Sequence, residues 1–172
     1  MKAGKFKIFP WLPLAGLLLG MTGCHPAALV VPSYIQSLGV ALVDNRTSYY
    51  GLDTVFTQAL IHQFQIDGRL QVVDPDKADM VVKMTIRQYV QEPQMYASNN
   101  YVLEYRLSIV YDLAAVDEQE KKTFVEDDNK IHSYFFYTPQ YTGAPNMTMD
   151  QAVTQLADDT AYVVARRVLE GN

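Results

Sequence analysis

Two stretches of alternating apolar and polar residues dominate the hydrophobic pattern of the chain. From 78 to 90, one face carries Met80, Val82, Met84, Ile86 and Val90, and the other carries Lys83, Thr85, Arg87 and Tyr89. From 101 to 113 the alternation is cleaner, and the apolar face holds Tyr101, Leu103, Tyr105, Leu107, Ile109, Tyr111 and Leu113. A period of two is typical of strands with one buried face. The pattern therefore predicts two long strands that share a core.

Three further strands are predicted from less regular runs. Apolar or β-branched segments at 37–43 and 69–73 are each followed by turn-forming residues, as expected of short buried strands. A fifth strand is predicted over 122–138, where Glu126, Asp127 and Asp128 interrupt the apolar pattern. We expect a bulge or break at these acidic residues.

Two segments have the helical period instead. The first starts at Leu52 and closes at Asp67-Gly68, where the glycine is a natural helix stop. The second opens at Thr148, because Thr148 and Gln151 have the spacing of a capping box. Its predicted apolar stripe comprises Met149, Ala152, Val153, Leu156, Thr160, Val163, Val164 and Val168.

These elements predict an α+β fold. A sheet with one apolar face needs a cover, which two amphipathic helices can supply. We expect a two-layer sandwich, with both helices packed on one face of a mixed four- to five-stranded sheet. The other face is left for solvent or a partner, and it is predicted to carry Lys83, Arg87, Tyr89, Glu104 and Arg106.

The N-terminus has the layout of an export signal. Lys2, Lys5 and Lys7 precede an apolar run of about a dozen residues, which is shorter than the roughly 20 that a spanning helix needs. The single cysteine follows directly, and Met21-Thr22-Gly23-Cys24 resembles a bacterial lipobox, with methionine in place of the usual leucine. We expect residues 1–23 to be a lipoprotein signal peptide, Cys24 to be acylated, and residues 24–34 to be a lipidated tether before a domain at 35–172. The alternative is a conventional signal peptide that ends in cysteine.

Charge limits the classes of ligand. Loss of the three signal lysines would leave 11 basic against 19 acidic residues, a formal charge of −8. Such a domain is not expected to bind nucleic acid. An anionic ligand would need a local group of cations, and the candidates are Arg46, Arg69, Arg87, Arg106, Lys121 and Lys122. The alternative for each is a solvated surface charge, and the two lysines can simply keep a sheet edge soluble.

No catalytic pattern is found in the sequence. The histidines His25, His62 and His132 fall in a tether, a helix and a strand, without the spacing of metal ligands. The acidic pairs at 127–128 and 158–159 are adjacent in sequence, so their side chains diverge. Nucleophile and phosphate-loop motifs are absent from the sequence as well. We expect a protein that is not an enzyme and needs neither metal nor cofactor.

Taken together, the segments resemble the lipopolysaccharide-assembly lipoprotein family, LptE. The resemblance rests on the lipobox and on four segments of the domain: the strand leading to Asn45-Arg46-Thr47, the helix from Leu52, the run RLQVVD before Ala78-Asp79, and the Glu104-Tyr105-Arg106 centre of the next strand. The segment 123–138 departs from the family pattern. Because His25 and not aspartate follows the cysteine, the lipobox resemblance also implies the outer membrane.

The resemblance implies specific partners. A member of this family would plug the lumen of the outer-membrane barrel LptD, support its assembly, and help lipopolysaccharide reach the outer leaflet. Contacts with the barrel or with lipopolysaccharide are then expected at Arg46, Arg87, Tyr89, Arg106, Lys121 and Lys122. The alternatives are an auxiliary periplasm-facing lipoprotein, which activates a cell-wall synthase or serves an ABC lipid transporter, and a periplasmic hydrolase, for which no convergent catalytic set is found.

Overall fold

The computed structural model describes residues 31–171. The strands are β1 (Ser37–Val40), β2 (Asp44–Asn45), β3 (Gln71–Val72), β4 (Met80–Tyr96), β5 (Val102–Asp117) and β6 (Thr123–Tyr137). The helices are α1 (Leu52–Asp67), a 3₁₀ turn η1 (Pro75–Lys77) and α2 (Met149–Glu170). The predicted order of strand, helix, strands and helix is therefore confirmed.

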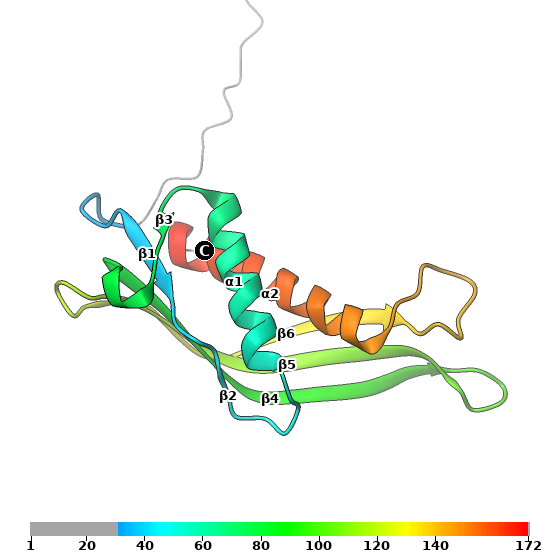
Figure 1. The fold of residues 1–172 in the computed structure, drawn as a ribbon. Helices are drawn as coiled ribbons and strands as arrows, with labels where there is room; N and C mark the ends of the chain where they lie inside the picture. Colours follow the sequence, from blue (N-terminus) through cyan, green and yellow to red (C-terminus); the bar gives the residue numbers. More distant parts are fainter. Residues whose placement is uncertain (1–30, 172) are drawn as a thin grey trace, which may run out of the picture.

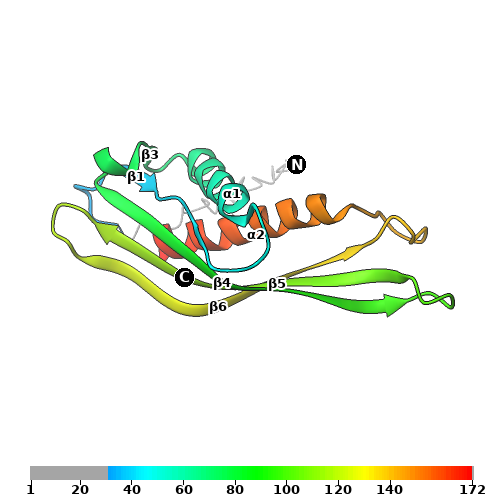
Figure 2. The same ribbon diagram turned by 60° about the horizontal axis from the view of Figure 1, so that its bottom comes forward.

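The strands form one open mixed sheet, in the order β3-β1-β4-β5-β6, with β2 also paired to β4. Pairs among β1, β2, β3 and β4 are parallel, whereas β4, β5 and β6 are antiparallel neighbours. Both long helices lie on one side of this sheet, and no described element covers the other side (Figures 1 and 2). The predicted α+β fold is confirmed. The sheet has six strands, and not the four or five predicted, because Asp44 and Asn45 pair with β4 instead of forming a turn.

Both helix boundaries follow the local signals. The Gly68 backbone at the end of α1 has φ of 69°, a left-handed conformation that glycine adopts without strain. At the start of α2, the Thr148 hydroxyl accepts from Gln151 N while the Gln151 side chain accepts from Thr148 N. This reciprocal pair is the predicted capping box, so local hydrogen bonds define the first turn of α2.

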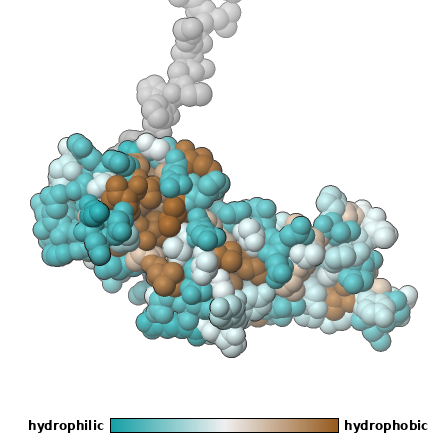
Figure 3. Space-filling view, viewed as in Figure 1, coloured by the Kyte–Doolittle hydropathy of each residue, from teal (hydrophilic) through white to brown (hydrophobic). Residues whose placement is uncertain are grey.

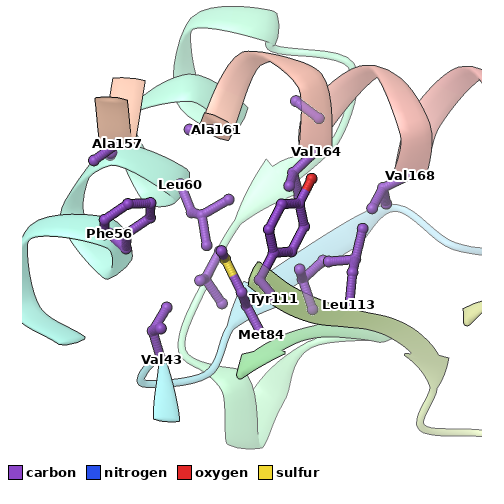
Figure 4. Close-up of a cluster of buried hydrophobic side chains, with 14 of the residues drawn as sticks. Val43, Phe56, Leu60, Met84, Tyr111, Leu113, Ala157, Ala161, Val164 and Val168 are labelled. Carbon is purple, nitrogen blue, oxygen red and sulfur yellow. The ribbon is translucent and has the colours of Figure 1, made fainter. Parts of the chain in front are cut away.

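The core lies between the helices and the sheet (Figure 4). Phe56 and Leu60 of α1 meet the sheet residues Met84, Tyr111 and Leu113, all less than 5% exposed. The facing stripe of α2 is rich in alanine, which lets the two helices approach closely, and its buried residues are Ala152, Val153, Leu156, Ala157, Thr160, Ala161, Val164, Ala165, Val168 and Leu169. Val163, predicted within this stripe, is 42% exposed, and the prediction was wrong there.

Candidate functional site

We define the open face as the side of β4, β5 and β6 that faces away from α1 and α2. Arg87 and Lys83 of β4 lie on it, as predicted. Its centre is apolar: Val90 is 38% exposed, Ile131 70% and Phe135 53%. Between them the Ser108 and Ser133 hydroxyls of neighbouring strands are hydrogen-bonded at 2.8 Å. An apolar centre with a charged margin is the usual layout of a protein contact surface.

Cross-strand ion pairs occupy the margin of the open face. Arg87 of β4 pairs with Asp112 of β5. Arg106 of β5 pairs with Glu92 directly opposite on β4, with 2.9 Å between Arg106 Nε and Glu92 Oε2. Exposed pairs of this kind contribute about 0–1 kcal/mol each. Both arginines therefore already have carboxylate partners, and an anionic ligand would have to displace them.

Tyr89 does not lie on the open face, and this part of the prediction was wrong. The register between β4 and β5 shifts between Ile86 and Gln88, so Arg87 is an extra residue in β4. A bulge of one residue reverses the faces beyond it. Tyr89 therefore points to the core side, where its ring lies 4.5 Å from the ring of Tyr49, and Val90 points outward. Burial raises the pKa of the Tyr89 hydroxyl far above its usual range.

The predicted cations are not gathered at one place. Lys121 and Lys122 lie in the β5–β6 turn, where Lys121 pairs with Glu118 and Lys122 lies 5.7 Å from the Phe124 ring centroid. Arg106 is eleven strand residues before Asp117, at the end of β5, which corresponds to roughly 35 Å. The structure instead brings Arg46 near Arg87, because Arg46 N donates to Ile86 O at 2.9 Å. Arg69, just after α1, pairs with Asp67 and Glu170, so the six candidates form separate groups.

The loop between β2 and α1, which also holds the candidate Arg46, carries the most exposed aromatic residue of the described chain. Tyr50 is 98% exposed, and it follows Tyr49, whose carbonyl accepts from the Asn45 side chain at 2.8 Å. A depression of about 540 Å³ lies against this loop, between the end of β1 and the start of α1. Leu42, 70% exposed, also borders it. The sequence reasoning singled out Asn45-Arg46-Thr47 in this region but not Tyr50, although the tyrosine pair before Gly51 is visible in the sequence.

Two carboxylates hold the N-terminal end of the described domain. Asp79 Oδ2 accepts from Ser37 Oγ at 2.7 Å and from Ser37 N at 3.0 Å. The buried Asp117 accepts from Tyr34 Oη at 2.7 Å, and its other oxygen accepts from the amides of Gln119 and Glu120. We call Tyr34, Ser37, Asp79 and Asp117 the N-terminal clamp.

The hydrogen bonds of the N-terminal clamp shift the pKa values of three of its members. The hydrogen bond from Ser37, followed by the Gln36 amide, lowers the pKa of Asp79. The Glu120 amide and then the Tyr34 hydroxyl lower the pKa of Asp117. The same bond to Asp117 is the main reason that the pKa of Tyr34 rises to about 12. Sequence reasoning missed the clamp, although Asp117 falls in phase with the apolar positions Leu113 and Ala115 of β5.

The described residues offer no grouping for metal chemistry. Within residues 31–171, no set of three or more His, Cys, Asp or Glu side chains could hold a metal ion. Burial lowers the pKa of His132, which lies half-buried on β6. None of the described helices combines the length and apolar character needed to cross a bilayer. Apolar surface is distributed in separate patches among polar residues in the view of Figure 3.

Solved structures share this fold at low sequence identity. The PelC L103M dodecamer from Paraburkholderia phytofirmans aligns with a TM-score of 0.51 and 9% identity over 84% of this chain and 93% of that one. The hypothetical protein CT253 from Chlamydia trachomatis aligns with a TM-score of 0.50 and 13% identity, over 78% and 96% of the two chains. These likenesses concern the fold alone. A search of curated proteins finds no match.

A family model gives a more specific assignment. The model described as "LptE: Lipopolysaccharide-assembly" matches residues 35–169, which include nearly all of every helix and strand of the structure. The sequence resemblance to this family is thereby confirmed. Proteins of the family are generally non-enzymatic assembly lipoproteins. The chain belongs to the LptE lipopolysaccharide-assembly family.

Proposed function

We propose that this LptE-family protein is an outer-membrane lipoprotein that plugs the LptD barrel, supports its assembly, and assists lipopolysaccharide transport to the outer leaflet. The observation that carries the proposal is the family match over residues 35–169. The barrel, lipopolysaccharide and an outer-membrane site are what membership of this family implies. The open face supplies a surface on which such a partner can rest.

The polarity of the open face suits a water-filled lumen. Barrel interiors are polar, so a plug needs hydrogen-bonding groups outside and an apolar core within. Two ion pairs, Arg87 with Asp112 and Arg106 with Glu92, border the open face. Its apolar centre is small, comprising Val90, Ile131 and Phe135. This composition favours a protein partner over direct insertion into lipid.

The anchor in this proposal is acylated Cys24, which lies outside the described residues. Nine residues lie between it and Tyr34, so the ten residue steps of this segment can extend about 35 Å at most. Stable membrane attachment needs more than one acyl chain, which an acylated lipoprotein cysteine supplies. Because Tyr34 and Ser37 are hydrogen-bonded to the carboxylates of the N-terminal clamp, a pull on the tether would be transmitted to β4 and β5. The tether boundary at 34 stays a prediction, although Val31 is already buried in the core.

Most candidate cations for direct contact with lipopolysaccharide are already paired with carboxylates. Arg46 Nε lies 2.8 Å from Asp44 Oδ2, and Lys121 pairs with Glu118. Lys122 has no carboxylate partner among the described residues. The β5–β6 turn is therefore the best remaining place for a phosphate contact.

Purification from outer membranes tests the proposal against its alternative. The full chain with a C-terminal tag is solubilised in mild detergent, captured, and its partners identified by mass spectrometry. We expect an outer-membrane barrel in near-equal amount. Recovery of an inner-membrane transporter or a periplasmic cell-wall synthase without a barrel would instead support the auxiliary lipoprotein. A matched control is Cys24→Ala, which should lose the membrane fraction and with it the barrel.

A further inference from the structure

A cavity lies between α2 and β6 and contains a buried hydroxyl without a partner. Its volume is about 270 Å³, and its lining includes Tyr111, Leu113 and Val163. Tyr111 is 4% exposed, and its hydroxyl points toward α2 (Figure 4). Among residues 31–171, every fully enclosed side-chain oxygen or nitrogen has a hydrogen-bond partner, whereas the Tyr111 hydroxyl has none. This hydroxyl therefore opens into the cavity, where it can bind a polar group.

One positive charge at the cavity is only loosely paired. Arg167 of α2 is fully engaged, because Nε and Nη2 lie 2.6 and 3.1 Å from the two oxygens of Asp127 and Nη1 donates to Gly171 O at 3.0 Å. Arg167 and Asp127 thus neutralise each other. Lys130 Nζ lies 3.7 Å from Asp127 Oδ1, longer than an ordinary hydrogen bond, and its side chain is 50% exposed. Lys130 is therefore available to an anionic group.

The groups that can donate to such an anion are neighbours in the sheet. Lys130 of β6 lies directly opposite Tyr111 of β5, so their Cβ atoms are about 5 Å apart. The half-buried ring of His132 also lines the cavity. Asp159 of α2, whose charge acts on His132, accepts from the Gln155 amide at 3.0 Å and does not line the cavity. An ammonium, a hydroxyl and an imidazole suit a carboxylate.

The edge of β6 beside this cavity has unpaired main-chain groups. In the sheet order β6 is terminal and pairs with β5 along one side. Thr138 N donates to Leu103 O of β5, so the odd-numbered residues of this part of β6 direct their N–H and C=O groups outward. Within the window 131–135 these are Ile131, Ser133 and Phe135. Alternating N–H and C=O groups of this kind are complementary to another polypeptide, and not to a lipid or a free ion.

Two features limit the length of a chain that pairs there. At one end, the register with β5 shifts at the bulge between Asp127 and Lys130. At the other end, Met147 N already donates to Tyr137 O at 2.9 Å. The segment 131–135 between them has no Lys, Arg, Asp, Glu, proline or glycine. An added strand therefore has to stop beside Lys130, which is the position of the cavity.

We propose that this edge and cavity bind the carboxyl-terminal end of an extended partner peptide, antiparallel to β6, with its terminal carboxylate beside Lys130 and Tyr111. The bulge selects a chain end over a continuous strand. The charge of Lys130 selects a carboxylate over an ammonium group, and with it the antiparallel direction. The window offers up to about six main-chain hydrogen bonds. The inference goes beyond the proposed function and does not depend on a barrel.

Side chains of the window and of α2 indicate what such a peptide would carry. Ile131 and Phe135 are 70% and 53% exposed on the open face, and Val163 is 42% exposed on the helix side. Alternate side chains of an added strand would contact these two apolar surfaces. Because the window itself is uncharged, we expect an uncharged peptide with β-branched residues.

Synthetic peptides test the proposal on the wild-type full chain in mild detergent. The probe is fluorescein-labelled Thr-Val-Thr-Val-Thr-Val, made with a free terminal carboxylate or with a terminal amide, and binding is measured by fluorescence anisotropy. We expect the acid to bind with a Kd below about 100 µM and the amide at least about tenfold more weakly. The acid with every main-chain amide N-methylated should also lose binding, because it cannot donate to β6.

Three results with these peptides would overturn the proposal. The first is equal affinity of acid and amide, and the second is no binding of the acid at about 100 µM protein. The third is full binding of the N-methylated acid, which would show a site for a small carboxylate without strand pairing. Because all three measurements use wild type, no variant has to fold for the proposal to be decided.

Substitutions then test the position of the carboxylate. Lys130→Met and Tyr111→Phe should each bring the affinity for the acid closer to that for the amide, which a merely structural role would not do. Lys77→Met is the matched control, because Lys77 lies exposed in η1, away from the cavity. Circular dichroism checks that each variant is folded. A folded Lys130→Met that keeps the wild-type ratio of acid to amide affinity would contradict the assignment.

Discussion

Leu107 and Ser108 are neighbours on β5 that the structure places on opposite faces of the sheet. Leu107 is fully buried in the core and lies between Gln91 of β4 and Tyr134 of β6. Ser108 lies on the open face, bonded to Ser133. An aspartate at 107 would lose the packing of a leucine and bury a carboxyl without a partner, whereas an aspartate at 108 would remain in water. Comparing Leu107→Asp with Ser108→Asp therefore tests which face of β5 is buried.

The expected magnitudes are well separated. Removing a buried leucine side chain costs about 2–5 kcal/mol, and an unpaired buried carboxyl adds several more. Because a domain is typically stable by about 5–15 kcal/mol, Leu107→Asp should be largely unfolded at neutral pH. Ser108→Asp loses one exposed hydrogen bond and should change stability by about 1 kcal/mol or less.

Urea unfolding followed by far-ultraviolet circular dichroism measures both variants. Leu107→Ala is a useful third variant, because it creates the cavity without the carboxyl and should fall between the other two. Similar urea midpoints for Leu107→Asp and Ser108→Asp would refute the assignment of the faces. A midpoint for Ser108→Asp below that of Leu107→Asp would show that the open face is the buried one.

Three further predictions concern the anchor, the clamp and the turn. Cys24→Ala should abolish incorporation of a labelled fatty acid and release the chain from the membrane. The pKa of Asp117 and that of Asp79 are lowered in the folded protein, so both carboxylates stabilise the fold at pH values above the ordinary carboxyl range. This contribution is lost as the pH falls below about 4. Asp117→Asn should therefore flatten the acid limb of a thermal-stability profile. Lys121→Glu combined with Lys122→Glu should weaken lipopolysaccharide capture, and added salt should weaken wild-type capture in the same direction.

Each of these has an outcome that contradicts it. Fatty-acid label that persists in Cys24→Ala would place acylation elsewhere. An unchanged acid limb in Asp117→Asn would mean that the carboxylate contributes nothing to folding. Unchanged capture by a folded Lys121→Glu, Lys122→Glu variant would remove the β5–β6 turn from any lipopolysaccharide site and leave barrel support as the remaining role.

Periodicity predicted the sheet faces wherever the strands are regular. On β5, the alternation placed Leu107, Ile109 and Tyr111 in the core, and all three are less than 5% exposed. On β4 the same rule failed after Arg87, because one extra residue in a strand reverses every later position. Nothing in the sequence around Arg87 marks that bulge. A bulge or break in β6 was predicted, since consecutive acidic residues interrupt its apolar pattern. The structure has the bulge between Asp127 and Lys130, where Asn129 has φ of 53°.

The candidate surface was harder to predict than the fold, because a charge shows its sign in the sequence but not its partner. Arg87 and Arg106 were candidates for contact with an anionic ligand, yet each lies beside a carboxylate of the adjacent strand. The pairing register of β4 with β5 determines those partners, because it places Glu92 directly opposite Arg106 although Glu92 is fourteen residues earlier in the chain. The same register creates the Asp79 and Asp117 clamp, whose members are far apart in the chain.

Pairing of the basic residues bears on which role the protein can perform. A site that captured anionic glycolipid by charge alone would need cations without carboxylate neighbours, and the domain also carries a net negative charge in the predicted mature form. Arg87 and Arg106 instead pair across β4 and β5 at the exposed margin of the long hairpin. A face with internally neutralised charges can lie against a polar wall at little desolvation cost beyond that of its own pairs. The electrostatics of the open face therefore favour support of a protein partner over electrostatic capture of a lipid, which is why the barrel, and not lipopolysaccharide, is the first partner to seek.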